Sequence, residues 1–111
     1  MSDQAIYELD TVVALLQAKE YARLLEYVRK SAECGVSEAE CELGNIYFCG
    51  QGVPADPVEA ERWLTKAALQ NNPVAWNNLG TLYSSYDAQK SKQWYKRAVE
   101  LGFMSAAHLA K

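Results

Sequence analysis

The sequence predicts an all-α solenoid, a fold built from consecutive pairs of packed helices. The chain has 111 residues, half of them hydrophobic, which is enough to form one domain around one core. Two segments are copies of one unit, because four residues recur with an offset of 36 positions. Repeats of this length are typical of helical solenoids, which usually present binding surfaces. The recurring residues are Ala39, Leu43, Gly44 and Tyr47, then Ala75, Leu79, Gly80 and Tyr83.

A second set of recurring residues marks the loop inside each repeat. Downstream of the first set, a Trp, a basic residue and an Ala recur with an offset of 31 positions. The smaller offset means that the later copy lacks five residues between its two helices. Deletions of this kind map to loops, so the boundary between the two helices lies there. These residues are Trp63, Lys66 and Ala67, then Trp94, Arg97 and Ala98.

The first two pairs of helices are predicted at 3–17 with 19–34 and at 37–49 with 57–70. The first pair matches the repeat only in part, as terminal repeats that cap a stack often do. In the second pair, Ser37 with a glutamate three residues later predicts a capping box. Asp56-Pro57-Val58-Glu59 predicts another, with proline in the first helical position that it favours.

A third pair is predicted at 73–85 and 87–101, where Asn72 and Asp87 mark the starts. Helices are expected to end at Gly35, Asn71 and Gly102, residues that tolerate the left-handed conformation. The expected single domain, 1–111, has repeats at about 1–35, 36–71 and 72–102 and a stub at 103–111, in which another helix starts.

The recurring residues have the sizes that helix packing requires. Leu43 and Tyr47 are four positions apart and therefore share a face of their helix. Gly44 lies beside that face, so it lets the partner helix approach closely. Trp63 and Ala67 place one bulky and one small residue on the facing helix. Large residues opposite small ones allow helices to interdigitate, which predicts that Trp63 is part of the core.

Residues 37–71 carry the pattern Ala39…Leu43-Gly44-x-x-Tyr47-x-x-Gly50-x-Gly52-Val53-x-x-Asp56…Ala60-x-x-Trp63-x-x-Lys66-Ala67-Ala68. This pattern resembles the Sel-1-like repeat, a relative of the tetratricopeptide repeat. Residues 73–102 match it without the glycine-containing loop, and residues 1–35 match only in part. The resemblance implies a right-handed α-α superhelix in which the first helix of each pair lines the concave side. It also implies an adaptor that holds partner proteins, with no catalytic residues in the repeat itself.

The resemblance further implies a row of partner-binding residues on the concave side. In tetratricopeptide geometry, ligand-facing positions lie two before, two after and five after the repeat leucine. Ala14 belongs to the same positions in the first repeat, and His108 would extend the series beyond the third. We call the following eight residues the concave row: Tyr7, Thr11, Cys41, Asn45, Phe48, Asn77, Thr81 and Ser84.

No arrangement of residues in the sequence predicts catalysis, a cofactor or a metal site. His108 is the only histidine, so a Ser-His-Asp or Cys-His set would depend on it. Gly50-Gln51-Gly52 lacks the pattern of a phosphate-binding loop and is expected to form a tight turn. The cysteines form no Cys-x-x-Cys pair and are odd in number, which argues against a disulfide framework or structural zinc. We expect Cys34, Cys41 and Cys49 to be small buried apolar residues.

Charge and hydropathy limit the choice of partner. The net charge is −3, which does not favour nucleic acid or an anionic membrane. The basic residues near Lys92 and Lys96 form a stripe that is short for nucleic-acid binding. The sequence contains neither a signal peptide nor a membrane span, which predicts a cytoplasmic protein.

Three function classes follow. The first is an adaptor that binds another protein, with pairing of two copies through the open end near 104–111 as an additional interaction. The second is an immunity or antitoxin protein that neutralises a bacterial effector, a role that Sel-1-like proteins resemble in some bacteria. A hydrolase is the least favoured class, because the sequence lacks a catalytic set.

Overall fold

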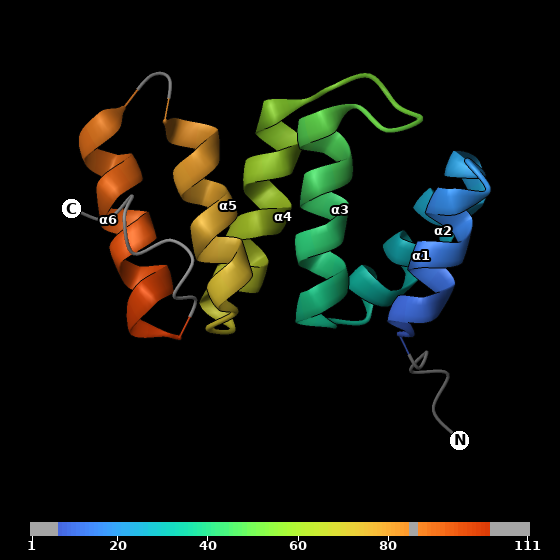
Figure 1. Cartoon of the computed structure of the whole chain (residues 1–111), viewed down its shortest axis with the longest axis horizontal. Coiled ribbons are helices and arrows are strands. Elements are labelled where there is room, and N and C mark those ends of the chain that lie inside the picture. Colours follow the sequence, from blue (N-terminus) through green and yellow to red (C-terminus); the bar gives the residue numbers. More distant parts are fainter. Residues whose placement is uncertain (1–6, 85–86, 103–111) are drawn as a thin grey trace.

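The computed structural model describes residues 7–84 and 87–102, which form α-helices and connecting turns without any strand. Figure 1 shows the helices standing side by side along the long axis of the molecule. This confirms the predicted all-α superhelical repeat fold. The stub predicted at 103–111 lies outside the described residues. The helices are α1 (Leu9–Gln17), α2 (Tyr21–Glu33), α3 (Ser37–Cys49), α4 (Pro57–Leu69), α5 (Pro73–Tyr83) and α6 (Ala88–Glu100).

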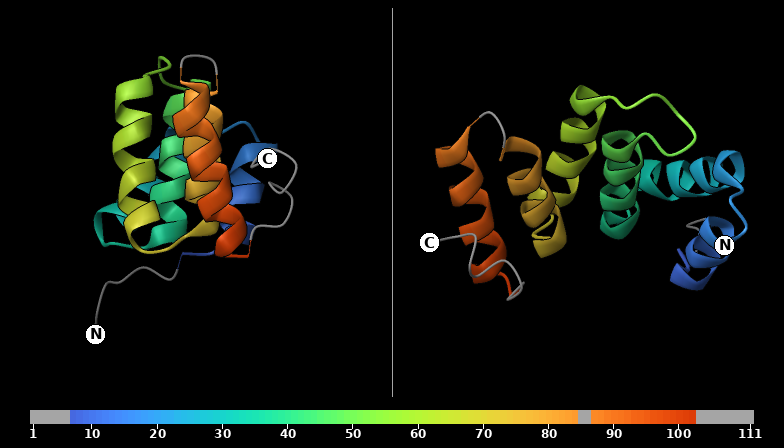
Figure 2. Two further views of the ribbon diagram at one scale, coloured as in Figure 1. Left: turned by 90° about the vertical axis from the view of Figure 1, so that its left-hand side faces the viewer. Right: turned by 45° about the horizontal axis from the view of Figure 1, so that its top comes forward.

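Each helix packs against the next one along the chain, from α1 to α6. In addition, α3 contacts α5, so the first helices of the second and third pairs are neighbours on one side of the solenoid. Figure 2 shows the same row of helices from its end and from a tilted direction. This arrangement is what brings side chains of α3 and α5 together into a common surface.

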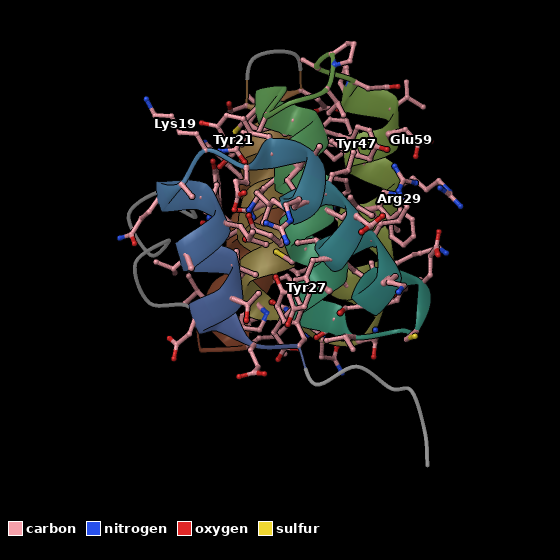
Figure 3. The ribbon with its side chains drawn as sticks, turned by 90° about the vertical axis from the view of Figure 1, so that its right-hand side faces the viewer. Lys19, Tyr21, Tyr27, Arg29, Tyr47 and Glu59 are labelled. Atoms are coloured by element: carbon pink, nitrogen blue, oxygen red, sulfur yellow. The ribbon has the colours of Figure 1, made fainter. Side chains whose placement is uncertain are left out.

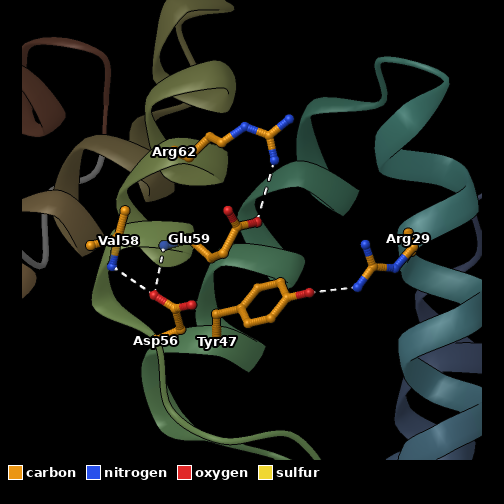
Figure 4. Close-up of polar contacts among 6 residues, drawn as sticks. All are labelled: Arg29, Tyr47, Asp56, Val58, Glu59 and Arg62. Atoms are coloured by element: carbon orange, nitrogen blue, oxygen red, sulfur yellow. Dashed lines mark hydrogen bonds and ion pairs between the residues drawn. The ribbon is translucent and has the colours of Figure 1, made fainter.

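The helix starts follow the predicted caps with one exception. The Asp56 carboxylate accepts the backbone N–H groups of Val58 and Glu59, both at 3.1 Å (Figure 4). Asn72 and Asp87 cap α5 and α6 in the same way. Side-chain oxygens in this position satisfy backbone donors that have no partner within the helix.

The exception is the capping box predicted at the start of α3. Val36 is the N-cap residue there and no side chain caps the helix, so the prediction for Ser37 and Glu40 is wrong. Glu40 is buried and accepts a hydrogen bond from Gln70 Nε2 at 2.8 Å. The same Gln70 amide donates to the carbonyl of Gly35 at 2.9 Å. A tertiary contact with the end of α4 therefore occupies the carboxylate that local sequence rules assign to the cap.

Close packing of α3 on α4 depends on a glycine, as predicted. A Cβ atom at Gly44 would lie 2.6 Å from Cγ of Leu64, closer than real Cβ contacts. Trp63 is only 4% exposed and packs in the same core as Val28 and Leu43. The repeat pattern thus correctly identifies both the small and the large residue of this interface.

The structure differs from the repeat pattern at one tryptophan, and from the expected burial of the cysteines at two positions. Trp94, the counterpart of Trp63, is half-buried and packs edge-to-face with Tyr83 and Trp76. Of the three free cysteines, Cys41 is buried, whereas Cys34 and Cys49 are exposed. Both exposed cysteines lie at helix ends, because Cys34 is the C-cap residue of α2 and Cys49 is the last residue of α3.

The loop between α3 and α4 packs on the preceding repeat. Gly52 has a φ of +74°, and a Cβ atom there would lie 2.4 Å from Cβ of Tyr21 in α2. Near the same boundary, Arg29 of α2 donates to the Tyr47 hydroxyl of α3; Figures 3 and 4 show these two side chains pointing toward one another. The glycine-containing loop of the second repeat therefore packs against the first repeat. The sequence predicts only that this loop forms a tight turn.

Candidate protein-binding surface

A chain of side-chain amides connects α3 with α5 within the concave row. Asn78 Nδ2 donates to Asn45 Oδ1 at 2.9 Å and to Cys41 Sγ at 3.5 Å. Asn77 Nδ2 in turn donates to Asn78 Oδ1 at 3.3 Å. The structure thus brings together three predicted residues from two helices. Asn78, which the positional rule does not select, is the residue that joins them.

The remaining residues of the concave row on α3 and α5 are exposed. Phe48 is 39% exposed near the end of α3, so its side chain is accessible at the surface. The Thr81 hydroxyl lies 2.9 Å from the Tyr95 hydroxyl and donates to the carbonyl of Asn77. The Ser84 hydroxyl donates to the carbonyl of Thr81 at 2.8 Å. These hydroxyls are therefore held in place by contacts within the third repeat.

The first repeat contributes to the surface differently. Tyr7 stacks on Tyr27 with ring centroids 5.8 Å apart, and its hydroxyl is buried without a hydrogen-bond partner in the described part of the chain. Thr11 lines a separate hollow of about 350 Å³ between α1 and α2, together with Arg23 and Lys30. Ala14 is exposed, and His108 lies outside the described residues. The concave row is thus continuous from α3 to α5, whereas Thr11 faces a hollow of its own.

Two hollows adjoin at Glu38 on this side of the molecule. One, of about 160 Å³, is lined by α3 and the start of α5; the other, of about 330 Å³, lies between α3 and the region before α1. The first hollow is lined by Glu38, Cys41, Glu42, Asn45, Asn72 and Val74. The second is lined by Tyr7, Leu9, Val36 and Glu38.

The two glutamates in these hollows were missed by the sequence prediction. In the sequence, Glu38, Glu40 and Glu42 occupy alternate positions, which predicts that neighbouring glutamates in this series point in different directions. Glu38 and Glu42, however, are four positions apart and share one face of α3, while Glu40 is buried on another. The helical i, i+4 rule alone was sufficient to pair them.

The surroundings of this surface favour the uncharged forms of three groups, Glu42, Cys41 and Tyr7. Burial raises the pKa of the Glu42 carboxyl. Burial, and next the negative charge of Glu42, raise the pKa of the Cys41 thiol to about 12. Burial and the same carboxylate also raise the pKa of the Tyr7 phenol. At neutral pH the thiol and the phenol are therefore protonated and available as hydrogen-bond donors.

Comparison with known families identifies this architecture. The Sel1 repeat pattern matches residues 37–72 and 76–103, more than half of the chain. The chain belongs to the Sel1 repeat family. Sel1 repeats are generally protein–protein interaction modules and typically form non-catalytic helical scaffolds.

Proteins from three bacteria are similar to this chain. The crystal structure of a Sel1 repeat protein from Oxalobacter formigenes matches 96% of this chain with a TM-score of 0.72 and 28% identity. A protective antigen of uropathogenic Escherichia coli, c5321, matches 81% with a TM-score of 0.69 and 27% identity. The uncharacterized protein NMB1327 of Neisseria meningitidis serogroup B is 36% identical over 72 residues, which are 65% of this chain. The chain spans 49%, 22% and 15% of these three proteins, respectively.

The second helix of the second repeat, α4, carries two basic residues over an aromatic ring. Lys66 Nζ and Arg62 Cζ lie 4.8 Å and 5.0 Å from the ring centroid of Trp63. Arg62 also pairs with Glu59 at 3.3 Å (Figure 4). Among the described residues, no cluster of histidine, cysteine or acidic side chains is arranged to hold a metal ion. None of the helices described is long and apolar enough to cross a membrane.

Proposed function

We propose that this chain is an adaptor that binds a partner protein through the concave row extended by Asn78. The observation that supports the proposal is the amide chain between Asn45, Asn78 and Asn77, which begins on α3 three positions before the exposed Phe48. Each asparagine side chain has two donor hydrogens and a carbonyl oxygen that accepts two hydrogen bonds. The amides therefore retain capacity for a partner's backbone, and Phe48 supplies an apolar contact of the kind that dominates interface energetics.

The experiment begins with a pull-down and mass spectrometry to obtain a partner, which is then purified. Calorimetry compares its affinity for the wild type and for a Phe48→Ala, Asn77→Ala double variant. We expect a loss of tenfold or more, which corresponds to about 1.4 kcal/mol. The helical circular-dichroism signal and the melting midpoint should remain nearly unchanged, because Phe48 is exposed and Asn77 is only half-buried.

The matched control replaces an apolar and a polar residue on the outer helix α4. Val58→Ala with Thr65→Ala removes side chains of similar character that are exposed on α4. This pair should leave the affinity unchanged. Binding that survives the concave change, but is lost when Lys92 and Lys96 are replaced with glutamate, would place the partner on α6 and overturn the proposal.

Two further proposals concern the chain as a whole. We propose that residues 1–111 form one repeat domain in the cytoplasm, where the exposed thiols of Cys34 and Cys49 stay reduced. Pairing of two copies would involve 104–111, which lies outside the described residues. Cell fractionation tests the compartment, and light scattering of the full chain against a chain ending at Gly102 tests the pairing.

Neutralisation of a bacterial effector is an alternative use of the same surface. A toxin gene next to the gene for this chain, and protection of cells that express that toxin, would favour it over a general adaptor role. A hydrolase remains the least favoured class, because Sel1 repeat proteins are typically non-catalytic scaffolds. Hydrolysis of a screening substrate by the purified chain would overturn this order.

A further inference from the structure

The side of α1 opposite its contact with α2 is exposed and partly apolar. At this end of the row of helices, α1 packs mainly against α2 among the described helices (Figure 1). Its buried side carries Val12, whereas Leu9 is 65% exposed and Val13 is 43% exposed. Removing such side chains from water is favourable, and the end repeats of a solenoid usually present a polar outer side. We define the α1 face by six exposed residues: Leu9, Asp10, Val13, Ala14, Gln17 and Ala18.

The α1 face consists of two rows that differ in the size of their side chains. Residues four positions apart form a ridge on the surface of a helix, and two such ridges lie next to each other here. The larger ridge is Leu9, Val13 and Gln17, and the smaller ridge is Asp10, Ala14 and Ala18. Helices pack closely when large side chains lie opposite small ones. The α1 face therefore carries both halves of a complementary contact.

A second copy of α1 in the antiparallel direction matches this face. With Val13 of one copy opposite Ala14 of the other, Leu9 lies opposite Ala18, so the larger ridge meets the smaller one. Asp10 then lies opposite Gln17, whose amide can donate to the carboxylate. Two-fold symmetry makes each of these contacts twice, because the same surface is used on both copies.

The charges at the two ends of α1 favour the same arrangement. Glu8 is the N-cap residue and Lys19 follows the C-cap residue, and both are exposed. Figure 3 looks onto this end of the molecule and shows Lys19 pointing outward, away from the other helices. In the described part of the chain, no ion pair includes Glu8 or Lys19.

Only an antiparallel pair of α1 helices places these charges in attraction. Glu8 of each copy then lies opposite Lys19 of the other, whereas a parallel pair places like charges together. The antiparallel direction also places the positive end of one helix dipole beside the negative end of the other. Size and charge therefore indicate the same occupant for this face.

We propose that two copies of this chain pair through the α1 face in an antiparallel arrangement with two-fold symmetry. This inference goes beyond the proposed function, because it does not involve the partner of the concave row. It also uses the opposite end of the chain from the pairing proposed through 104–111. A single pair of short helices buries less area than the ~1,600 Å² of a usual interface, so the pairing is weak and reversible.

The test is sedimentation equilibrium of the full chain at concentrations up to roughly 1 mM, a range that weak interfaces require. We expect a reversible monomer–dimer equilibrium for the wild type. Glu8→Lys and Lys19→Glu should each weaken the dimer by about tenfold or more, because like charges then face each other at both ends of the pair. The double variant, Glu8→Lys with Lys19→Glu, restores opposite charges and should recover most of the affinity.

A second pair of variants tests the apolar part of the contact. Val13→Asp places a charge at the centre of the α1 face and should abolish the dimer. Val58→Asp is the matched control, because Val58 is a 75% exposed valine on α4, and it should leave the dimer unchanged. Circular dichroism should show the wild-type helical signal for all of these variants, because the changed residues are exposed.

Several outcomes would overturn the inference. The first is a monomer at every concentration, and the second is a dimer that neither the single charge reversals nor Val13→Asp weaken. A double charge variant as weak as the single ones would show that Glu8 and Lys19 do not face each other, and would also reject the arrangement. A dimer that depends on 104–111 instead would place the contact at the other end of the chain.

The outcome is separable from that for the proposed function. The Phe48→Ala, Asn77→Ala variant should form the dimer as the wild type does, because neither residue belongs to the α1 face. Conversely, Val13→Asp should still bind the partner of the concave row. Failure of one proposal therefore leaves the other standing.

Discussion

Replacing Trp63 with alanine should remove the largest side chain from the interior between α2, α3 and α4. Trp63 is 4% exposed and packs with a fully buried cluster that includes Val28 and Leu43. Truncating a core Trp or Phe to alanine costs about 3–5 kcal/mol. The ring also supports the cations of Arg62 and Lys66, and each such contact contributes about 0.5–1 kcal/mol at an exposed site. Because domains of this kind are stable by roughly 5–15 kcal/mol, the change should remove a large share of the stability.

The corresponding change at Trp94 tests the structure against the repeat pattern. The pattern treats Trp63 and Trp94 as equivalent, which predicts equal costs. Trp94 is half-buried, so its truncation should cost less than that of Trp63, within the ~0.5–3 kcal/mol of ordinary substitutions. A third variant, Trp63→Phe, keeps an aromatic ring at this position. It removes an indole N–H that is buried without a partner in the described region. It should therefore cost much less than Trp63→Ala.

The assay is urea unfolding of the wild type and the three variants, followed by far-ultraviolet circular dichroism. The expected order of the free energy of unfolding places Trp63→Ala lowest, with Trp94→Ala above it and Trp63→Phe closer to the wild type. If Trp63→Ala does not fold, its failure agrees with the prediction, and Trp63→Phe should still unfold cooperatively. An unchanged midpoint for Trp63→Ala, or a larger loss for Trp94→Ala, would refute the assignment of Trp63 to the core.

Two more predictions concern caps and charge. Asp56→Ala should cost about 0.5–2 kcal/mol in urea unfolding, because its carboxylate accepts two backbone N–H groups. Ser37→Ala should lower the free energy of unfolding by less than about 0.5 kcal/mol, because Ser37 is not a cap residue. A larger loss of stability for Ser37→Ala than for Asp56→Ala would instead support the capping box predicted from the sequence. Glu42→Gln should raise the thermal midpoint at neutral pH. Burial raises the pKa of this carboxyl in the folded state, so ionisation costs stability above the folded pKa. The gain should fade as the pH falls from that pKa to the ordinary pKa of a glutamate, below which the wild-type carboxyl is protonated in the folded and the unfolded state. A gain that persists in acid would contradict this explanation.

Features that repeat along the chain were predictable from the sequence. The recurrence of Gly44 and Gly80 predicted two close helix approaches, and a Cβ atom would meet Leu64 at the first and Tyr95 at the second. The starts of three helices followed from side chains that bond to their own backbone. Such interactions are local, so a short stretch of sequence contains all of the information.

Features that depend on contacts between distant segments were not predictable. Glu40 is withdrawn from its expected cap by Gln70, which lies 30 positions later in the chain. Trp94 differs from Trp63 because burial depends on the neighbours on both sides, which the repeat pattern does not specify. The hollow lined by Tyr7 and Glu38 depends on the position of Tyr7 beside α3, and the first repeat matches the pattern too weakly to fix that position.

The hydrogen bonds between α3 and α5 also tie the second repeat to the third. Asn78 donates to Asn45 at 2.9 Å, and Asn72 at the start of α5 donates to Ser37 at 3.3 Å. Because hydrogen bonds are directional, these contacts restrict the rotation of the asparagine side chains. For the proposed partner, side chains that are already held in this way lose little rotational freedom on binding.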